Sequence, residues 1–386
     1  MTHAVRGLGL VVSLVLASTL YAIPTAAQEK AASIPPSTAA YVYIQIQGPE
    51  GSVYGFRASS SGHLSTIPAS PFKLAGEIIG STPTKFFTLG EDLIHSYGIT
   101  SDGAIESQLS QIPFFDYSGH ACGPPDSVQN GAVLDHTGKY IYVLLECAGE
   151  DLSAEYQSFL INSDGAFSYD GDTSLPASWR DDGYAPDLPS ILGNESFAYA
   201  EVDDGHLSGL NGFRRTSAGT LELMQFTESD PTFGACDGQV DVRGPNASPV
   251  GNYVVLQIYP CDSSPAYLGS YAVASNGNIS STNTLSNMPT SSIVSRSTFS
   301  PSGDLFVAYG NGIEIYKFNG AAPLTLWQTA LNGGSIDQIA WDGSSHMYAL
   351  SRYYNELYVF TVTSTSVTET SSISIGSPYG MVVVSK

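Results

Sequence analysis

One nine-residue frame recurs through the chain and constrains its fold more than any other feature. An aromatic residue is followed four positions later by Ser, then by Gly and an aliphatic or aromatic residue at steps of two, as in Tyr97-Gly-Ile-Thr-Ser-Asp-Gly-Ala-Ile105. Clear copies begin at Phe56, Tyr97, Phe159, Phe213 and Tyr271, and weaker copies begin at Tyr316 and Phe360. Asp-Gly, Asn-Gly and Ser-Gly tolerate positive φ and close antiparallel hairpins. The sequence therefore predicts seven β-rich units, spaced by about 50 residues.

Each unit divides into four short strands, expected at residues 76–80, 85–89, 93–99 and 104–112 in the most compact copy. Residues 41–46 read as a second strand without a first, and residues 379–385 as a first strand without a second. Pairing these two ends completes a unit and removes two free sheet edges. The predicted fold is all-β: a seven-bladed β-propeller of four-stranded antiparallel blades, closed by strand 379–385 joining the N-terminal blade. The aromatic residue of each frame is expected to pack between blades.

The N-terminus reads as a secretory signal peptide over residues 1–27. Arg6 precedes an apolar run from Leu8 to Ile23, and Pro24-Thr-Ala-Ala27 resembles a small-residue cleavage site. An uncleaved membrane anchor is the alternative, although the run is short for a span. Residues 28–40 are expected to be a disordered leader and residues 41–386 a single propeller. We expect a secreted or periplasmic protein with no membrane insertion after cleavage.

The net charge is −22, from 14 Lys and Arg against 36 Asp and Glu. Such a surface repels phosphate backbones, so nucleic acid is excluded as a partner. A small molecule or a protein is the expected partner, bound by a monomer.

The four cysteines occur as two pairs with the same spacing of 25 residues. Even number, twin spacing and an exported chain favour the disulfides Cys122–Cys147 and Cys236–Cys261, while other pairings stay open. No C-x-x-C with a nearby His pair is present, so no zinc or other metal site is predicted.

Several segments resemble the seven-bladed lactonase family, the relatives of bacterial 6-phosphogluconolactonase. They include Val53-Tyr-Gly-Phe-Arg-Ala-Ser-Ser-Ser-Gly-His-Leu64, Ile67-Pro-Ala-Ser-Pro-Phe72 and Phe299-Ser-Pro-Ser-Gly-Asp-Leu305. The resemblance covers roughly residues 41–386 and implies a lactone hydrolase with its site in the central funnel. The Gly-Pro-Arg-His motif of the phosphogluconolactonase members is replaced here by Arg243-Gly-Pro-Asn246, so no catalytic residue is transferred.

Lactone hydrolysis needs a base that activates water and a cation or donor that stabilises the oxyanion. In a propeller these groups come from the segments before first strands and after second strands. The candidates there are Asp126, Glu146, Glu201, Asp203, Asp204, His206, Asp241, Arg243, Arg296, Asp337 and Arg352. His206 with Asp203 and Glu201 forms the most functional-looking cluster, and the three Arg could recognise a carboxylate; a solvated loop and local ion pairs are the structural alternatives.

No cofactor is predicted, although the oxygens of Glu201-Val-Asp-Asp204 leave a structural Ca²⁺ open. The G-x-S-x-G, H-E-x-x-H and P-loop motifs are absent. Two functions remain: a propeller that binds a small ligand or protein partner through its mouth loops, which the missing catalytic motif favours, and a lactonase-like hydrolase.

Overall fold

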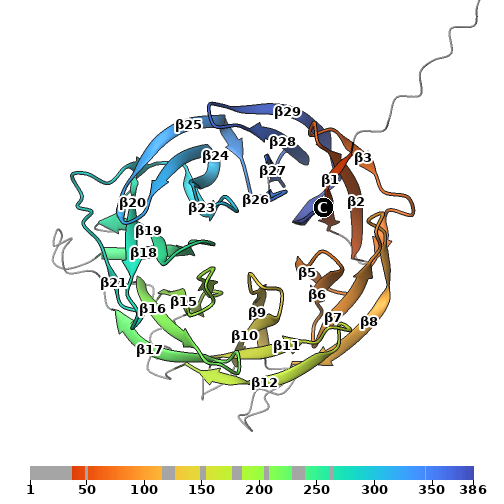
Figure 1. Ribbon diagram of the computed structural model, residues 1–386, viewed down its shortest axis with the longest axis horizontal. Coiled ribbons are helices and arrows are strands. Elements are labelled where there is room, and N and C mark those ends of the chain that lie inside the picture. The colour runs from red at the N-terminus through yellow and green to blue at the C-terminus, as the bar shows by residue number, and fades with distance from the viewer. Residues whose placement is uncertain are drawn as a thin grey trace, which may run out of the picture. The chain divides into compact units, whose positions relative to one another are not determined.

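The computed structural model describes residues 37–47, 51–114, 127–147, 154–175, 185–203, 208–227, 240–260, 264–343 and 345–386. Residues 36–386 form one compact unit, in which seven antiparallel sheets surround a central channel (Figure 1). Every regular element of the described chain is a β-strand. No helix long and apolar enough to cross a membrane occurs among these residues.

The first three blades, from the channel outward, have the following strands. They are β30 (Pro378–Ser385), β1 (Thr38–Ile46), β2 (Ser52–Ser59) and β3 (Leu64–Thr66), with β4 (Phe72–Lys73) beside β2; β5 (Glu77–Ser81), β6 (Lys85–Leu89), β7 (Leu93–Ile99) and β8 (Ile105–Pro113); and β9 (Ser127–Leu134), β10 (Tyr140–Cys147), β11 (Ala154–Ile161) and β12 (Phe167–Ser174).

The remaining four blades follow in the same order. They are β13 (Ala185–Pro186) with β14 (Ser190–Ile191), β15 (Phe197–Asp203), β16 (Ser208–Arg215) and β17 (Leu221–Thr227); β18 (Val240–Ala247), β19 (Tyr253–Pro260) and β20 (Ala266–Val273) with β21 (Ile279–Ser280) and β22 (Thr290–Ser291); β23 (Val294–Phe299), β24 (Leu305–Asn319) and β25 (Ala322–Ser335); and β26 (Gln338–Trp341), β27 (His346–Ser351), β28 (Glu356–Val362) and β29 (Val367–Ser374).

The two ends of the chain close the ring. Strand β30 pairs antiparallel with β1, with Val383 opposite Val42, and supplies the innermost strand of the first blade. The predicted closure is confirmed. Strand β1 begins at Thr38, inside the stretch that the sequence assigns to the leader.

Blade six reaches four strands with three elements because β24 folds back on itself. Its first half pairs with β23 and its second half with β25. The amide of Phe318 donates to the carbonyl of Asp304 across this hairpin. The tight Gly310-Asn-Gly312 turn lets both strands form one continuous element.

The core consists of seven apolar clusters, each drawn from two successive blades. Each cluster contains one frame aromatic; Phe213 and Tyr316, for example, are fully buried in theirs. Since the clusters fill the spaces between blades, burial of apolar surface holds the ring together. The predicted role of the frame aromatics is confirmed.

The Gly of the frame has a second role, as an acceptor for the preceding blade. Gly103 and Gly219 adopt φ of +87°, and their carbonyls accept hydrogen bonds from the hydroxyls of Tyr43 and Tyr142, at 2.8 and 2.7 Å. The Tyr199 hydroxyl donates in the same way to the carbonyl of Gly277, the frame glycine of the following blade, at 2.7 Å. Each bond joins the second strand of one blade to the third hairpin of its neighbour, so it sets the positions of adjacent blades.

Candidate functional site

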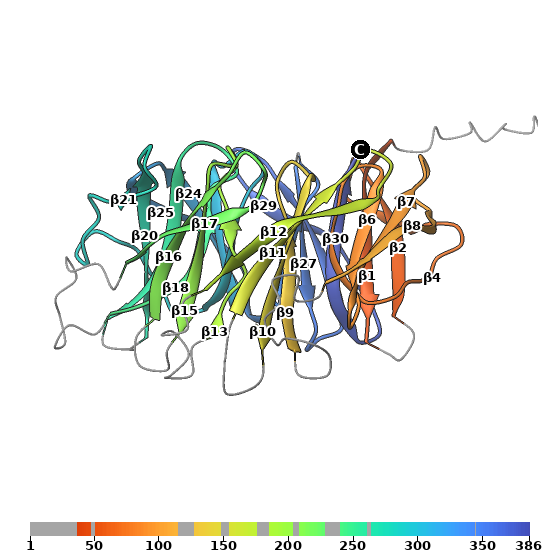
Figure 2. The same cartoon turned by 90° about the horizontal axis from the view of Figure 1, so that it is seen from below.

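The ring has two faces, and those sequence candidates that the structure describes lie on one of them. This mouth face, the lower edge in Figure 2, carries the connections from each blade to the next and those between second and third strands. The opposite face carries the remaining hairpins, which include those formed by the frame.

Only part of the predicted His206 cluster lies within the described residues. His206, Asp204 and Asp126 lie outside the described residues, and so do Cys122, Cys236 and Cys261. The side chains of Glu146, Asp203 and Cys147 also lie outside them, although their strands β10 and β15 are described. The two disulfides and the role of His206 therefore stay predictions.

Glu201 lies in a polar cluster between blades four and five. Its side chain is 9% exposed, and its Oε2 accepts a 2.6 Å hydrogen bond from the backbone amide of Gly244 in β18. Asp241, on the same strand, is also buried, and its Oδ2 accepts from Nε of Arg243. The Arg243 guanidinium carbon lies 5.3 Å from the centre of the Tyr259 ring, a cation–π geometry.

The sequence places Asp241 and Arg243 in a loop, but they lie within β18. The sequence predicts a first strand near residues 246–250. In the structure the strand begins at Val240 and continues through a register shift between Arg243 and Asn246, where Gly244 takes φ of +53°. The bulge directs the Gly244 amide to Glu201, since a bulge frees a backbone donor from the ladder.

Burial sets the chemistry of Glu201. It raises the pKa of this carboxyl to about 7, reinforced by Asp187 and Asp241 and opposed by the Gly244 amide and Arg243. A carboxyl with this pKa exchanges its proton near neutral pH, which suits a general base. The Oδ1 atom of Asp241 is buried without a hydrogen-bond partner among the described residues.

Gln45 occupies the position in blade one that Glu201 occupies in blade four. Each follows by two residues a Tyr that bonds a frame glycine of the next blade, Tyr43 and Tyr199 respectively. The Gln45 amide donates to the carbonyl of Gly76 at 3.0 Å and accepts from the amide of Ile78 at 2.9 Å, which ties it to the next blade. Glu201 likewise accepts a hydrogen bond from a backbone amide of the next blade, but its side chain can ionise.

Arg296, Asp337 and Arg352 form a second polar cluster. The Arg296 guanidinium donates to the carbonyl of Asp337 at 3.0 Å, and the Arg352 amide donates to the Asp337 carboxylate at 2.7 Å. The Arg352 guanidinium also covers the ring of Tyr379, 4.6 Å from its centre. The structure thus groups two of the three predicted Arg around Asp337, whereas Arg243 belongs to the Glu201 cluster.

Strand β18, which carries Asp241 and Arg243, and strand β23, which carries Arg296, are the innermost strands of neighbouring blades. Strands β18 and β23 are joined by the Asn246 amide, which donates to the carbonyl of Ser297 at 2.6 Å. Beyond these clusters a cavity of about 630 Å³ lies between the innermost strands of all seven blades. Its walls combine apolar side chains such as Ile79, Phe299 and Val382 with polar ones such as His136, Asn246 and Gln338.

Tyr259 and the Gly244 amide are site groups that sequence reasoning missed. Tyr259 lies two residues after Gln257 on the same face of β19, and its hydroxyl donates to the Gln257 side-chain Oε1 at 3.3 Å. Strand alternation could have identified it. Among the described residues no group of three His, Cys, Asp or Glu side chains could hold a metal ion, and the Glu201–Asp204 segment is only partly within them.

The fold and this cluster define a seven-bladed β-propeller with a polar site at the mouth of its channel. Solved structures with this fold include the periplasmic gluconolactonase of Pseudomonas aeruginosa, with 13% identity, a TM-score of 0.62, and 90% of this chain and 99% of that one covered. A Bacteroides fragilis protein provisionally described as a 6-phosphogluconolactonase has 14% identity, a TM-score of 0.61, and 90% and 98% coverage. A protein of unknown function from Desulfotomaculum acetoxidans is similar at 12% identity and a TM-score of 0.61, covering 90% of this chain and 99% of its own.

No protein-family model matches the chain, and no curated protein matches it. At identities this low, the structural likeness shows the fold alone. The chemistry has to be argued from the residues of the site.

Proposed function

We propose that the protein is a lactone hydrolase that opens a sugar lactone or a related lactone at the mouth of its channel. One observation carries the proposal: Glu201 is a nearly buried carboxyl with a pKa of about 7, close enough to Arg243 for their charges to interact. The lactonases among the proteins with this fold support the same chemistry.

The proposed reaction uses Glu201 as the base and Arg243 as the cation. The Glu201 carboxylate takes a proton from water, and the water oxygen attacks the lactone carbonyl carbon. Arg243, whose side chain is 44% exposed, stabilises the negative charge that develops on the carbonyl oxygen. The ring C–O bond then breaks, and Glu201 returns its proton to the leaving alkoxide, which yields a hydroxy acid.

The positions of the two charged groups match these roles. Arg243 is held by Asp241 and the Tyr259 ring, which orient its guanidinium. The Gly244 amide holds one Glu201 oxygen, and no described residue is recorded as a partner of the other. The net charge of −22 disfavours a phosphorylated lactone, so an uncharged lactone is the proposed substrate.

We further propose that the protein acts as a monomer outside the cytoplasm after cleavage behind Ala27. The charged, apolar and small-residue order of residues 1–27 supports this. Cell fractionation, with mass spectrometry of the mature N-terminus, tests it; protein found only in the cytoplasm and starting at Met1 would contradict it.

Turnover of uncharged sugar lactones and homoserine lactones tests the function, with a phosphorylated sugar lactone for comparison. We expect hydrolysis of the uncharged lactones, and a loss of about a hundredfold or more in kcat/KM for Glu201→Gln and Arg243→Ala. His206→Ala tests the loop predicted from sequence. Asp102→Asn and Arg57→Ala are matched controls, because this Asp–Arg pair, 3.6 Å apart, lies on the opposite face.

A second outcome would favour the binding function. No turnover, together with a rise in the unfolding temperature caused by a ligand that is not hydrolysed, would refute the hydrolase. Turnover that survives both Glu201→Gln and Arg243→Ala would refute the proposed site.

A further inference from the structure

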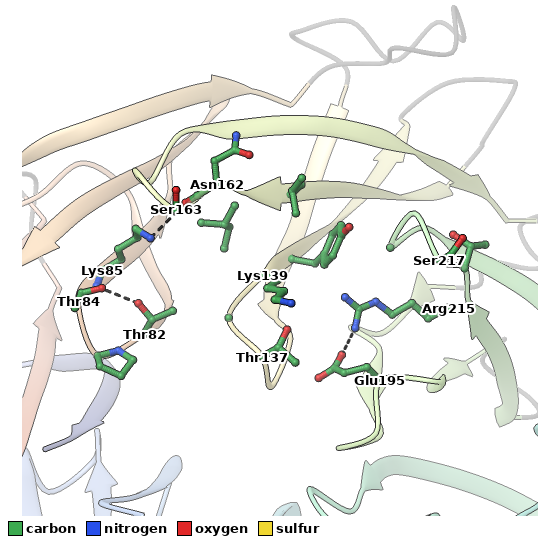
Figure 3. A pocket seen from close by; sticks show the side chains of 17 residues that line it. Thr82, Thr84, Lys85, Thr137, Lys139, Asn162, Ser163, Glu195, Arg215 and Ser217 are labelled. Carbon is green, nitrogen blue, oxygen red and sulfur yellow. Dashed lines mark hydrogen bonds and ion pairs between the residues drawn. The ribbon is translucent and has the colours of Figure 1, made fainter.

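A large cavity of the described residues lies on the face opposite the mouth. It has a volume of about 1030 Å³ and is bordered by hairpins of blades two, three and four (Figure 3). The turns between first and second strands contribute Thr82, Lys85, Lys139 and Glu195. The third hairpins of blades three and four, which contain the frame, contribute the remaining wall.

Three cationic side chains line this cavity in a protein with only 14 Lys and Arg in total. Arg215 is 9% exposed and bonds both Asp135, at 2.9 Å, and Glu195. It also covers the Tyr140 ring, with its guanidinium carbon 4.6 Å from the ring centre. Arg215 is therefore a fixed part of the wall, and its charge is compensated.

The two lysines have no such compensation. Lys85 donates to the carbonyl of Asn162, at 3.3 Å, and lies within 4 Å of no carboxylate of the described residues. Lys139 is exposed at the tip of the β9–β10 turn, and the described part of the chain gives its ammonium no hydrogen bond or ion pair. In Figure 3 its side chain extends toward the side of the cavity where Arg215 lies. Two ammonium groups thus face one open volume in a strongly acidic protein.

Hydroxyl groups also line the cavity. Thr84, Ser163 and Ser217 line the cavity, and their hydroxyls have no recorded partner among the described residues. The Asn162 amide, which donates to Ser168 at 3.2 Å, and Thr137 add further polar atoms to the border. The cavity is far larger than an inorganic anion needs, and its polar groups are spread over several turns.

We propose that this cavity binds a saccharide with more than one carboxylate, with one carboxylate at Lys139, another at Lys85, and the sugar hydroxyls at the Thr and Ser side chains. Ammonium groups bind a carboxylate through charge-assisted hydrogen bonds, and neutral hydroxyls exchange donor and acceptor roles with sugar hydroxyls. The separation of cations and hydroxyls favours an extended polyhydroxylated acid over a compact phosphate or sulfate. The proposal is independent of lactone hydrolysis, because the cavity lies on the face opposite Glu201.

Calorimetric titration of the intact protein with galacturonate and short oligogalacturonates tests the site, with galactose and sodium sulfate as comparisons. We expect the uronates to bind, galactose to bind much more weakly, and added salt to weaken uronate binding. Lys139→Gln should reduce the affinity about tenfold or more, because one charge-assisted hydrogen bond is lost. The Lys85→Gln, Lys139→Gln double variant should abolish measurable binding.

Lys317→Gln is the matched control. This lysine lies on the same face beside Trp327, in a separate cavity, so its loss should leave uronate affinity unchanged. Thermal unfolding of each variant verifies that it is folded. Uronate affinity that is undetectable at millimolar concentration, or equal in Lys139→Gln and the unmodified protein, would overturn the site. Sulfate binding as tight as uronate binding would overturn the saccharide assignment.

Discussion

Replacing Glu201 by Gln should make the protein more stable as the pH rises, relative to the unmodified protein. Burial raises the Glu201 pKa from 4.5 to about 7. Below about pH 4.5 the carboxyl is protonated in both folded and unfolded chains, so it costs nothing. Above about pH 7 the folded chain has to hold a buried carboxylate, whereas the unfolded chain exposes it to water. The native state therefore loses stability as the pH rises between these values.

The size of the effect follows from the pKa difference. A shift of roughly 2.5 units corresponds to about 3 kcal/mol of unfolding free energy, since one unit equals about 1.4 kcal/mol. Glutamine has the shape of glutamate and no charge, and Gln45 shows that this strand position accepts an amide. We expect the free energy of unfolding of Glu201→Gln minus that of the unmodified protein to grow by about 3 kcal/mol from about pH 5 to about pH 8.

Urea unfolding at a series of pH values measures this difference. Glu195, whose pKa burial also raises to about 7, is present in both proteins, so its contribution cancels. Activity should change in the opposite direction, because only ionised Glu201 accepts a proton: kcat/KM of the unmodified enzyme should rise through about pH 7. A stability difference that is constant with pH would show that Glu201 titrates at its ordinary value, which would refute its role as a poised base.

Three further predictions concern the ring. In urea unfolding, Gly103→Ala should destabilise the protein by more than the roughly 1 kcal/mol expected for Gly333→Ala. Both glycines have positive φ, but only the Cβ added at Gly103 would meet a side chain, the Tyr41 ring at 2.5 Å. Equal losses of stability in the two variants would contradict the packing argument. Tyr142→Phe should lower the free energy of unfolding by about 1–2 kcal/mol, because it removes the hydrogen bond to the next blade. Tyr348→Phe should lower it little, because the buried Tyr348 hydroxyl has no hydrogen-bond partner among the described residues. A larger loss for Tyr348→Phe than for Tyr142→Phe would contradict the interblade role. Removing residues 376–386 deletes β30 and exposes the edge of β1, so the truncated protein should aggregate on size-exclusion chromatography; a stable monomer would refute closure through β30.

Most of the fold was predictable because the repeat frame determines local structure. Strands β6 and β7 lie at the residues predicted, since apolar residues mark both strands and the Asp102-Gly103 turn marks the end of β7. The start of β18 was not predictable in this way. Pro245 signals a break, and only pairing with β19 shows that the strand continues through a bulge.

The candidate site was predictable by residue and not by geometry. Charged residues at strand ends identified Glu201, Arg243, Arg296 and Asp337 from sequence alone. Their grouping depends on which strand lies beside which, and that depends on the packing of successive blades. Nothing in the sequence near Lys139 indicates that it shares a cavity with Lys85, because two blades have to dock before their hairpins face one volume.

The comparison of Gln45 with Glu201 links the fold to the proposed activity. At Gln45 the amide both donates to and accepts from the next blade, so the side chain contributes stability and has no proton to exchange. Within the described residues, Glu201 makes one accepting bond, to Gly244, and its burial costs the native state free energy when it ionises. If the only role of this side chain were an interblade hydrogen bond, Gln would make that bond without the free-energy cost of a buried carboxylate. A role of Glu201 in catalytic proton transfer explains why this position has an ionisable carboxyl, because natural proteins keep locally unfavourable groups where function needs them.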